Sequence, residues 1–301
     1  MEVTDRSLIE IKDLTVECFA GSGDARIGLR CVSLAICQGE FNVFAGETGS
    51  GISLLARLIA GAAGPQVRFL GGTIHFEGRD LLRMKARDLT ALRRGPIGVI
   101  SGDPAGLLNP DRTVRQWLRD YGRRGGGHAG FPGEKEWSDY FYRVGLIEPE
   151  RILPQTPGEL SPLTVKRLLV MRAIMAGARL FICDEVAAGL DRIATYRFIE
   201  LLGQVRKDTG AGILLTTGTL RGVERYADRL AVFFEGGILE AGEPARLLGN
   251  PRFAYTREFR ACDPGLGDLR SELPSISREA VREAEAAVHE AVASPGEETT
   301  G

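Results

Sequence analysis

The chain has 301 residues, of which 44% are hydrophobic and 26% are charged, and this composition is typical of a globular protein rather than a disordered or fibrous one. Lysine and arginine total 38 against 40 aspartate and glutamate, and the net charge of −2 argues against general nucleic-acid binding. No apolar run approaches the roughly 18–20 residues of a membrane span, and the charged first residues predict no signal sequence. One figure is unusual: there are 39 glycines, well above the average share of about 7%.

Strand-like and helical segments alternate along the chain. Hydrophobic periodicity predicts strands at 8–18, 32–36, 41–45, 73–76, 97–100, 179–183, 212–216, 230–234 and 238–240. It predicts helices at 53–60, 193–207 and 277–293, and a helical, irregular segment at 103–158. Such alternation is typical of an α/β protein with a mainly parallel sheet that is covered on both faces. The last two strands are joined by Glu235-Gly236-Gly237, which predicts a hairpin turn.

A glycine-rich loop lies between the third predicted strand and the first predicted helix. Its sequence matches the phosphate-binding pattern G-x-x-x-x-G-K-[ST] except at the lysine: Gly46, Gly49, Ser50, Gly51, Ile52, Ser53. Glycines allow backbone N–H groups to converge on a phosphate at the start of a helix, and Ser53 remains available as a Mg²⁺ ligand. Ile52 replaces the lysine and removes a charge-assisted contact worth about 1.5–3 kcal/mol. Taken alone, the loop is equally compatible with a tight turn that binds no ligand.

A carboxylate pair follows the predicted strand at 179–183. Asp184 is placed to hold Mg²⁺, directly or through water, and Glu185 to act as the base for an attacking water. Such pairs are common on protein surfaces, so this one is informative because the glycine loop precedes it. Phe19 follows the first predicted strand, and an aromatic residue at a strand end more often belongs to the core.

Together these motifs resemble the ATP-binding subunits of ABC transporters, most closely those of the dipeptide, oligopeptide and nickel importer group. The resemblance extends from about Leu8 to about Tyr255. Four further segments carry it: residues 97–110, which contain Asp-Pro and Leu-Asn-Pro; 159–167; 227–237; and 251–256.

The resemblance implies a P-loop NTPase-type core with a mainly parallel sheet, an N-terminal antiparallel β subdomain and a helical insertion. It places an ABC-type ATP-binding domain at residues 1–256, with the helical subdomain inserted at about 103–165. Residues 257–301 would form a C-terminal extension with one helix. The end of this extension, 294–301, is expected to be disordered because it has nothing to bury.

Four catalytic motifs depart from the family pattern. Ile52 stands at the lysine of the phosphate loop, Gly102 at the glutamine that senses the γ-phosphate side and couples to the membrane partner, and Gly218 at the switch histidine. Pro162-Leu163 replaces the glycine pair of the signature segment, so that one backbone N–H is lost. Ser161 followed by Pro162 is nevertheless a favourable helix start. The residues that keep their family identity are Ser53, Ser161, Asp184, Glu185 and Asp191.

This pattern implies a degenerate subunit that binds ATP and Mg²⁺ weakly and hydrolyses little or none. The implied nucleotide contacts are Phe19, Gly46, Gly49, Ser50, Gly51, Ile52, Ser53, Ser161 and Asp184, with Ser53 and Asp184 on Mg²⁺ and Glu185 as the candidate base. The implied partners are a second ABC ATP-binding subunit and membrane permeases, at the cytoplasmic face of the membrane, and no nucleic acid. Two alternatives stay open: a non-enzymatic scaffold or regulatory protein without a transport role, and an active ATPase in which Arg57 replaces the lysine.

Overall fold

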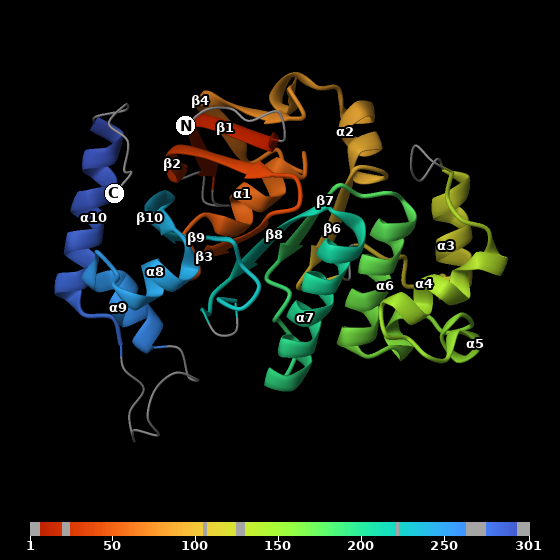
Figure 1. The fold of residues 1–301 in the computed structure, drawn as a ribbon. Coiled ribbons are helices and arrows are strands. Elements are labelled where there is room, and N and C mark those ends of the chain that lie inside the picture. The colour runs from red at the N-terminus through yellow and green to blue at the C-terminus, as the bar shows by residue number, and fades with distance from the viewer. Residues whose placement is uncertain are drawn as a thin grey trace.

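The structure, a computed structural model, describes residues 7–19, 25–104, 107–124, 130–220, 223–262 and 275–293. In this part of the chain the strands form two sheets, a four-stranded sheet in the order β2-β1-β4-β5 and a six-stranded sheet in the order β10-β9-β3-β8-β7-β6 (Figure 1). The expected α/β architecture, with an antiparallel sheet from the N-terminal part, is confirmed. No helix within the described ranges is both long and apolar enough to cross a lipid bilayer.

The four-stranded sheet is antiparallel where its pairings are recorded. Its strands are β1 (Ser7–Phe19), β2 (Ala25–Cys37), β4 (Val67–Phe76) and β5 (Arg79–Asp80). The predictions of strands at 32–36 and 73–76 were too short. The additional residues are mostly exposed or half-buried, so they lack the alternation that marks a strand, and pairing with β1 is what extends them.

The six-stranded sheet is parallel except for its edge hairpin, in which β10 runs antiparallel to β9. Its strands are β3 (Phe41–Ala45), β6 (Ile97–Ser101), β7 (Leu180–Asp184), β8 (Gly212–Thr217), β9 (Arg229–Phe234) and β10 (Gly237–Gly242). Every residue of β3 is buried, as expected for a central parallel strand that is covered on both faces. Because β3, β6, β7 and β8 run the same way, their carboxyl ends meet at one edge of the sheet.

Helices cover both faces of this sheet. Their bounds are α1 (Ile52–Ile59), α2 (Ala86–Arg93), α3 (Val114–Arg123), α4 (Trp137–Arg143), α5 (Pro149–Ile152), α6 (Pro162–Met175), α7 (Arg192–Thr209), α8 (Pro244–Gly249), α9 (Ala254–Ala261) and α10 (Arg278–Ala293). Short 3₁₀ turns occur at Leu81–Arg83, Glu134–Glu136 and Pro157–Glu159. The helix predicted at 53–60 begins one residue earlier, and α2 was not predicted because its mainly polar sequence buries only Leu92.

Two apolar clusters flank the six-stranded sheet. One joins α1 and Leu92 of α2 to the facing side chains of both sheets, and the other joins the opposite face to the helices from α3 onward, including the buried Trp117 and Trp137. The helices α3 to α6 lie on one side of the molecule and α8 to α10 on the other (Figure 1). The helix predicted at 277–293 is confirmed as α10, which contacts α9, β2 and β10. The predicted tail at 294–301 lies outside the described residues, and the domain limits at 256 and 165 stay predictions.

Candidate functional site

The glycine loop begins directly at the end of β3, at the carboxyl edge of the parallel sheet. The Gly46 amide donates a hydrogen bond to the Thr217 carbonyl at 3.2 Å, which ties the loop to the end of β8. Ligands bind at this edge in open α/β sheets because the loops there are close together and helices begin there. The β3–loop–α1 connection therefore places the loop where the sequence pattern requires it.

The loop has the backbone shape of a phosphate cradle. Gly49 and Gly51 have φ values of 91° and 94°, in the left-handed region that glycine adopts without strain. A Cβ at Gly51 would lie 2.6 Å from the Gly28 carbonyl oxygen, so only glycine fits against β2. Helix α1 has no side-chain cap, and its first N–H groups are therefore available to an anion. The buried Ser50 hydroxyl also has no hydrogen-bond partner within the described structure.

The side chain at the lysine position faces the protein interior. Ile52 is only 4% exposed and belongs to the apolar cluster that includes Leu55 and Phe44. Its own loop carries Glu47 instead of a cation. The cradle therefore combines a suitable backbone with an unfavourable charge for binding phosphate.

Four polar residues meet beside the loop. The Ser53 hydroxyl donates to Glu185 Oε1 at 3.1 Å, which joins α1 to the end of β7. The fully buried Thr216 hydroxyl donates to Asp184 Oδ1 at 2.6 Å and accepts from the Glu185 amide at 3.0 Å. The structure thus brings together three residues predicted from the sequence, Ser53, Asp184 and Glu185, and adds Thr216, which sequence reasoning missed. The adjacent Thr216-Thr217 pair at a strand end was the only signal for it.

Glu185 has an unusual backbone conformation. Its φ is 49°, in the left-handed region that costs an ordinary L-residue roughly 1–2 kcal/mol. Thr216 holds this backbone in place through the Glu185 amide. Retention of a non-glycine residue in such a conformation is common at functional sites.

At Gly102, the position of the family's glutamine, neighbouring backbone atoms leave no room for a side chain. The Gly102 amide donates to the Asp184 carbonyl at 2.7 Å. A Cβ at Gly102 would lie closer than 3.0 Å to the Glu185 carbonyl oxygen. At Gly218, the switch histidine position, the nearest atom to such a Cβ is the Gly46 carbonyl oxygen at 3.9 Å. The two glycines are therefore not equivalent: Gly102 is sterically required, whereas Gly218 has room for a side chain.

The signature segment forms a helix start, as predicted. The Ser161 hydroxyl accepts from the Thr164 amide at 3.1 Å, and Pro162 is the first residue of α6. The hydroxyl therefore caps its own helix, and Pro162 offers no N–H there. One turn later, Lys166 is fully buried and donates to the Ala188 carbonyl. The pKa of Lys166 is lowered, because the effect of burial exceeds the opposing effect of the Asp103 charge. Lys166 thus links α6 to the segment after Glu185, a contact that the sequence did not suggest.

Two aromatic residues bear on the site: Phe19, a predicted nucleotide contact, and Tyr255, which contacts the glycine loop. Phe19 is half-buried at the end of β1, and the Arg68 guanidinium lies 5.8 Å from its ring centre, so Phe19 is not a fully buried core residue. Tyr255 of α9 is buried and donates to Glu47 Oε2 of the glycine loop at 2.9 Å. Burial and the neighbouring Glu47 carboxylate raise the pKa of Tyr255. The segment 251–256, noted for its resemblance alone, therefore contacts the glycine loop.

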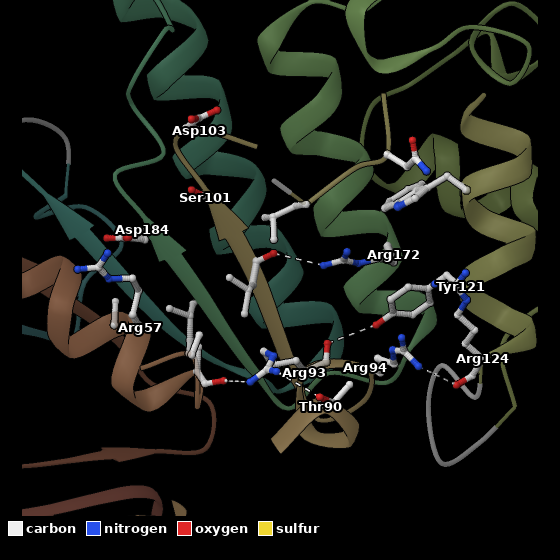
Figure 2. A pocket seen from close by; sticks show the side chains of 18 of the residues that line it. Arg57, Thr90, Arg93, Arg94, Ser101, Asp103, Tyr121, Arg124, Arg172 and Asp184 are labelled. Carbon is white, nitrogen blue, oxygen red and sulfur yellow. Dashed lines mark hydrogen bonds between the residues drawn. The ribbon is translucent and has the colours of Figure 1, made fainter. Parts of the chain in front are cut away.

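Arg57, the alternative cation, lies one turn beyond Ser53 on the exposed side of α1. Its side chain is directed toward Asp184, and both residues line one cavity (Figure 2). Arg57 therefore lies on the carboxylate side of the site, beyond the start of α1 where the loop amides converge.

Comparison with known proteins places this arrangement in a family. The sequence profile of the family described as ABC transporter matches residues 29–188, more than half of the chain. The oligopeptide transport ATP-binding protein OppD of Bacillus subtilis is 30% identical over 260 residues, which span 86% of this chain and 72% of OppD. The peptidoglycan transport ATP-binding protein YejF of Agrobacterium fabrum is 30% identical over 87% of this chain, but the match spans only 48% of YejF.

A solved structure supports the fold independently. The cbiO1 protein of Clostridium perfringens, part of the ABC transporter complex cbiONQ, superposes with a TM-score of 0.66 at 22% identity, covering 82% of this chain and 92% of that one. At this identity the likeness concerns the fold only. With the profile match and the OppD relationship, it leads to one conclusion: the chain belongs to the ABC transporter family.

Proposed function

We propose that this chain is a degenerate ATP-binding subunit of an ABC importer of the peptide type. It would pair with a competent ATP-binding subunit beneath membrane permeases, at the cytoplasmic face, and hydrolyse little or no ATP itself. The transport role rests on relatives that are named for oligopeptide and peptidoglycan transport. The chain spans about half the length of YejF and nearly three quarters of OppD, so its substrate and partners are inferred.

The burial of Ile52 is the observation that carries the proposed loss of activity. With its side chain 4% exposed in the apolar cluster, the loop has no cation for the β and γ phosphates. Glu47, Asp184 and Glu185 instead place three carboxylates at or beside the loop. Each missing charge-assisted hydrogen bond weakens binding by about 1.5–3 kcal/mol, or roughly ten- to a hundredfold or more.

Two other positions at which the family's residues are replaced support the same proposal. At Gly102 the Glu185 backbone takes the space in which a glutamine side chain would begin. In α6, Pro162 lacks the backbone N–H that would contact a nucleotide bound by the partner subunit, and the Leu163 side chain adds bulk where the phosphate would approach. A homodimer would therefore be defective in both halves of each composite site, which favours pairing with a different subunit.

The residues present fit a weak Mg-ATP site. The uncapped start of α1 and the glycine loop would hold the phosphates, and Ser53 with Asp184 would hold Mg²⁺, which supplies charge neutralisation between phosphates when bound. The Ser53 hydroxyl would keep its hydrogen on Glu185, because a metal ion binds the lone pairs of the hydroxyl oxygen. Glu185 would orient and deprotonate a water molecule, in a site that offers little stabilisation of the developing charge.

A titration of Mg-ATP onto the purified full chain tests the pocket. We expect weak binding that is reduced further in Ser53→Ala and Asp184→Asn. Binding that persists unchanged in both variants would contradict the proposed pocket. A steady-state turnover above about 1 s⁻¹ by the isolated chain, abolished by Glu185→Gln, would contradict the proposed loss of activity.

Purification from membranes tests the transport role. We expect the tagged full chain to co-purify with integral-membrane permeases and a second ATP-binding subunit after mild detergent extraction. Recovery only in a soluble complex without permeases would instead support the scaffold alternative.

A further inference from the structure

Helices α9 and α10 form one unit at an edge of the six-stranded sheet (Figure 1). The Ala254 amide at the start of α9 donates to Glu283 Oε2 of α10 at 3.1 Å. In the other direction, the Ser277 hydroxyl just before α10 donates to Glu258 Oε1 of α9 at 3.0 Å. Helix α10 also packs against β9 and β10, the hairpin at this edge of the sheet. The two helices and the hairpin therefore hold one another in place.

The β9–β10 hairpin contacts the glycine loop at Ser50. The Gly236 amide, in the turn of the hairpin, donates to the Ser50 carbonyl at 3.0 Å. A Cβ at Gly237, the first residue of β10, would lie 2.5 Å from Val288 Cγ1, so α10 packs directly against this turn. Helix α10 thus supports the glycine loop at Ser50 through the hairpin.

Tyr255 of α9 contacts the same loop at Glu47. Its hydroxyl donates to Glu47 Oε2 at 2.9 Å, and the Ser50 amide donates to the Glu47 carbonyl at 3.0 Å, which closes the turn 47–50. The Tyr255 side chain is 1% exposed, and its ring centre lies 4.8 Å from that of Phe234 and 6.0 Å from that of Phe259. The position of Tyr255 is therefore fixed by α9 and β9, independently of the loop that it contacts.

The middle of the turn has less support within the described structure. Thr48 and Gly49 are exposed, and no described atom lies within 4 Å of the place that a Cβ at Gly49 would take. A flexible loop must be ordered before its N–H groups can bind an anion together, and that ordering reduces the affinity. The contacts at the two ends of the turn therefore decide how well the cradle is formed before a ligand arrives.

We propose that Tyr255 is a positioning residue of the glycine loop, and that its bond to Glu47 lets α9 and α10 hold the loop in the shape that binds phosphate. The part that concerns phosphate rests on the proposed function, because it assumes that the loop binds a nucleotide. Removal of this bond leaves the turn attached through Ser50 alone. The loop then opens locally, while the helices and the sheet stay folded.

Hydrogen–deuterium exchange of the full chain without nucleotide tests the positioning role. The variants are Tyr255→Phe, Glu47→Ala and the combination of both. Each single variant should exchange the amides of residues 46–53 about tenfold faster, because a charge-assisted hydrogen bond that opposes local opening is lost. The double variant should exchange no faster than the single ones, because both changes remove the same bond. Glu47→Gln keeps an acceptor for the Tyr255 hydroxyl and should exchange more slowly than Glu47→Ala.

Two controls separate positioning from other effects. Tyr142→Phe makes the same chemical change at a side chain that is 57% exposed, and should leave the exchange of residues 46–53 within about twofold of the wild type. Leu153 is 7% exposed and follows α5, on the side of the molecule opposite α9 (Figure 1). Leu153→Ala should destabilise the whole fold through a cavity but leave the exchange of the loop within the same limit. Equal acceleration in Leu153→Ala, or additive acceleration in the double variant, would overturn the proposal.

Titration of Mg-ATP onto the same proteins connects the loop shape with binding. We expect Tyr255→Phe to bind at least about threefold more weakly, because the apparent affinity falls with the fraction of molecules whose loop is correctly shaped. Unchanged affinity in Tyr255→Phe despite faster exchange would overturn the role in phosphate binding. No binding by the wild type would contradict the proposed function, and the exchange rates alone would then decide whether Tyr255 positions the loop.

Discussion

The Ser53 hydroxyl donates a hydrogen bond to Oε1 of Glu185 at 3.1 Å across a sequence separation of 132 residues. The residue expected to bind Mg²⁺ and the residue expected to act as base therefore hold each other. The contact joins the start of α1 to the segment that follows β7, and Thr216 fixes the Glu185 backbone from β8. This bond uses the hydroxyl hydrogen of Ser53, so the lone pairs of its oxygen stay available to a metal ion.

Restoring the glutamine at Gly102 should destabilise the protein. A Cβ there would approach the Glu185 carbonyl oxygen closer than 3.0 Å, and overpacking of this kind costs about 1–3 kcal/mol. Gly218→His is the control, because the nearest atom to a Cβ at Gly218 is 3.9 Å away. We expect chemical denaturation to show a clear loss of stability for Gly102→Gln and less than half that loss for Gly218→His. Equal losses would mean that the two glycines are not distinguished by packing.

Replacing Ile52 by lysine should separate stability from ligand binding. The variant replaces an apolar side chain that is only 4% exposed. Loss of that burial should lower the free energy of unfolding by about 1.5–3 kcal/mol. The variant also supplies the missing cation, so Mg-ATP should bind about tenfold or more tightly. Ile52→Met, which stays apolar, should retain stability to within about 1.5 kcal/mol and gain no affinity. A folded Ile52→Lys variant with unchanged affinity would show that a cation at this position does not contact the bound phosphates.

The left-handed backbone of Glu185 predicts an unusual order of stability among its variants. Glu185→Gly and Glu185→Ala both remove the hydrogen bond to Ser53, but only glycine is free of strain at a φ of 49°. We expect the glycine variant to unfold at a higher denaturant concentration than the alanine variant, because its free energy of unfolding should be about 1 kcal/mol larger. The opposite order, which ordinary backbone positions show, would mean that the strain is absent in solution.

Tyr255 should contribute a stability that disappears in alkaline solution. Burial and Glu47 raise the pKa of Tyr255 above the ordinary 10.0, so the folded protein keeps a proton that the unfolded chain releases near pH 10. The unfolded state then binds fewer protons, and stability falls as the pH rises above that value. At pH 7, Tyr255→Phe should lose about 1.5–3 kcal/mol through its bond to the Glu47 carboxylate.

The difference between the wild type and Tyr255→Phe should therefore shrink as the pH rises above 10. Denaturation curves recorded between pH 7 and pH 11 measure it. Tyr142→Phe is the matched control, because Tyr142 is 57% exposed and should show no such pH-dependent difference. A constant gap at every pH would mean that the ionisation of Tyr255 is not linked to folding.

Much of the architecture could be predicted from local patterns. The apolar runs of β3, β7 and β8 and the glycine loop before α1 identify the sheet edge and the cradle. Ser161 and Pro162 predict the start of α6, since a cap and an N1 proline act within one turn. The first half of β4 was missed because its exposed residues are set in a strand by β1, not by their own sequence.

The sequence by itself determined the family, the alternation of strands and helices, and the positions at which working side chains are replaced, because each depends on residues within a short segment. Only the tertiary structure decided what those replacements do. Ile52 is buried in the apolar core, and the Glu185 backbone fills the space beside Gly102. Gly218 has room for a side chain, and Tyr255 donates a hydrogen bond to Glu47. These outcomes depend on how distant strands and helices pack, and close packing is a property of the assembled core and not of any single segment.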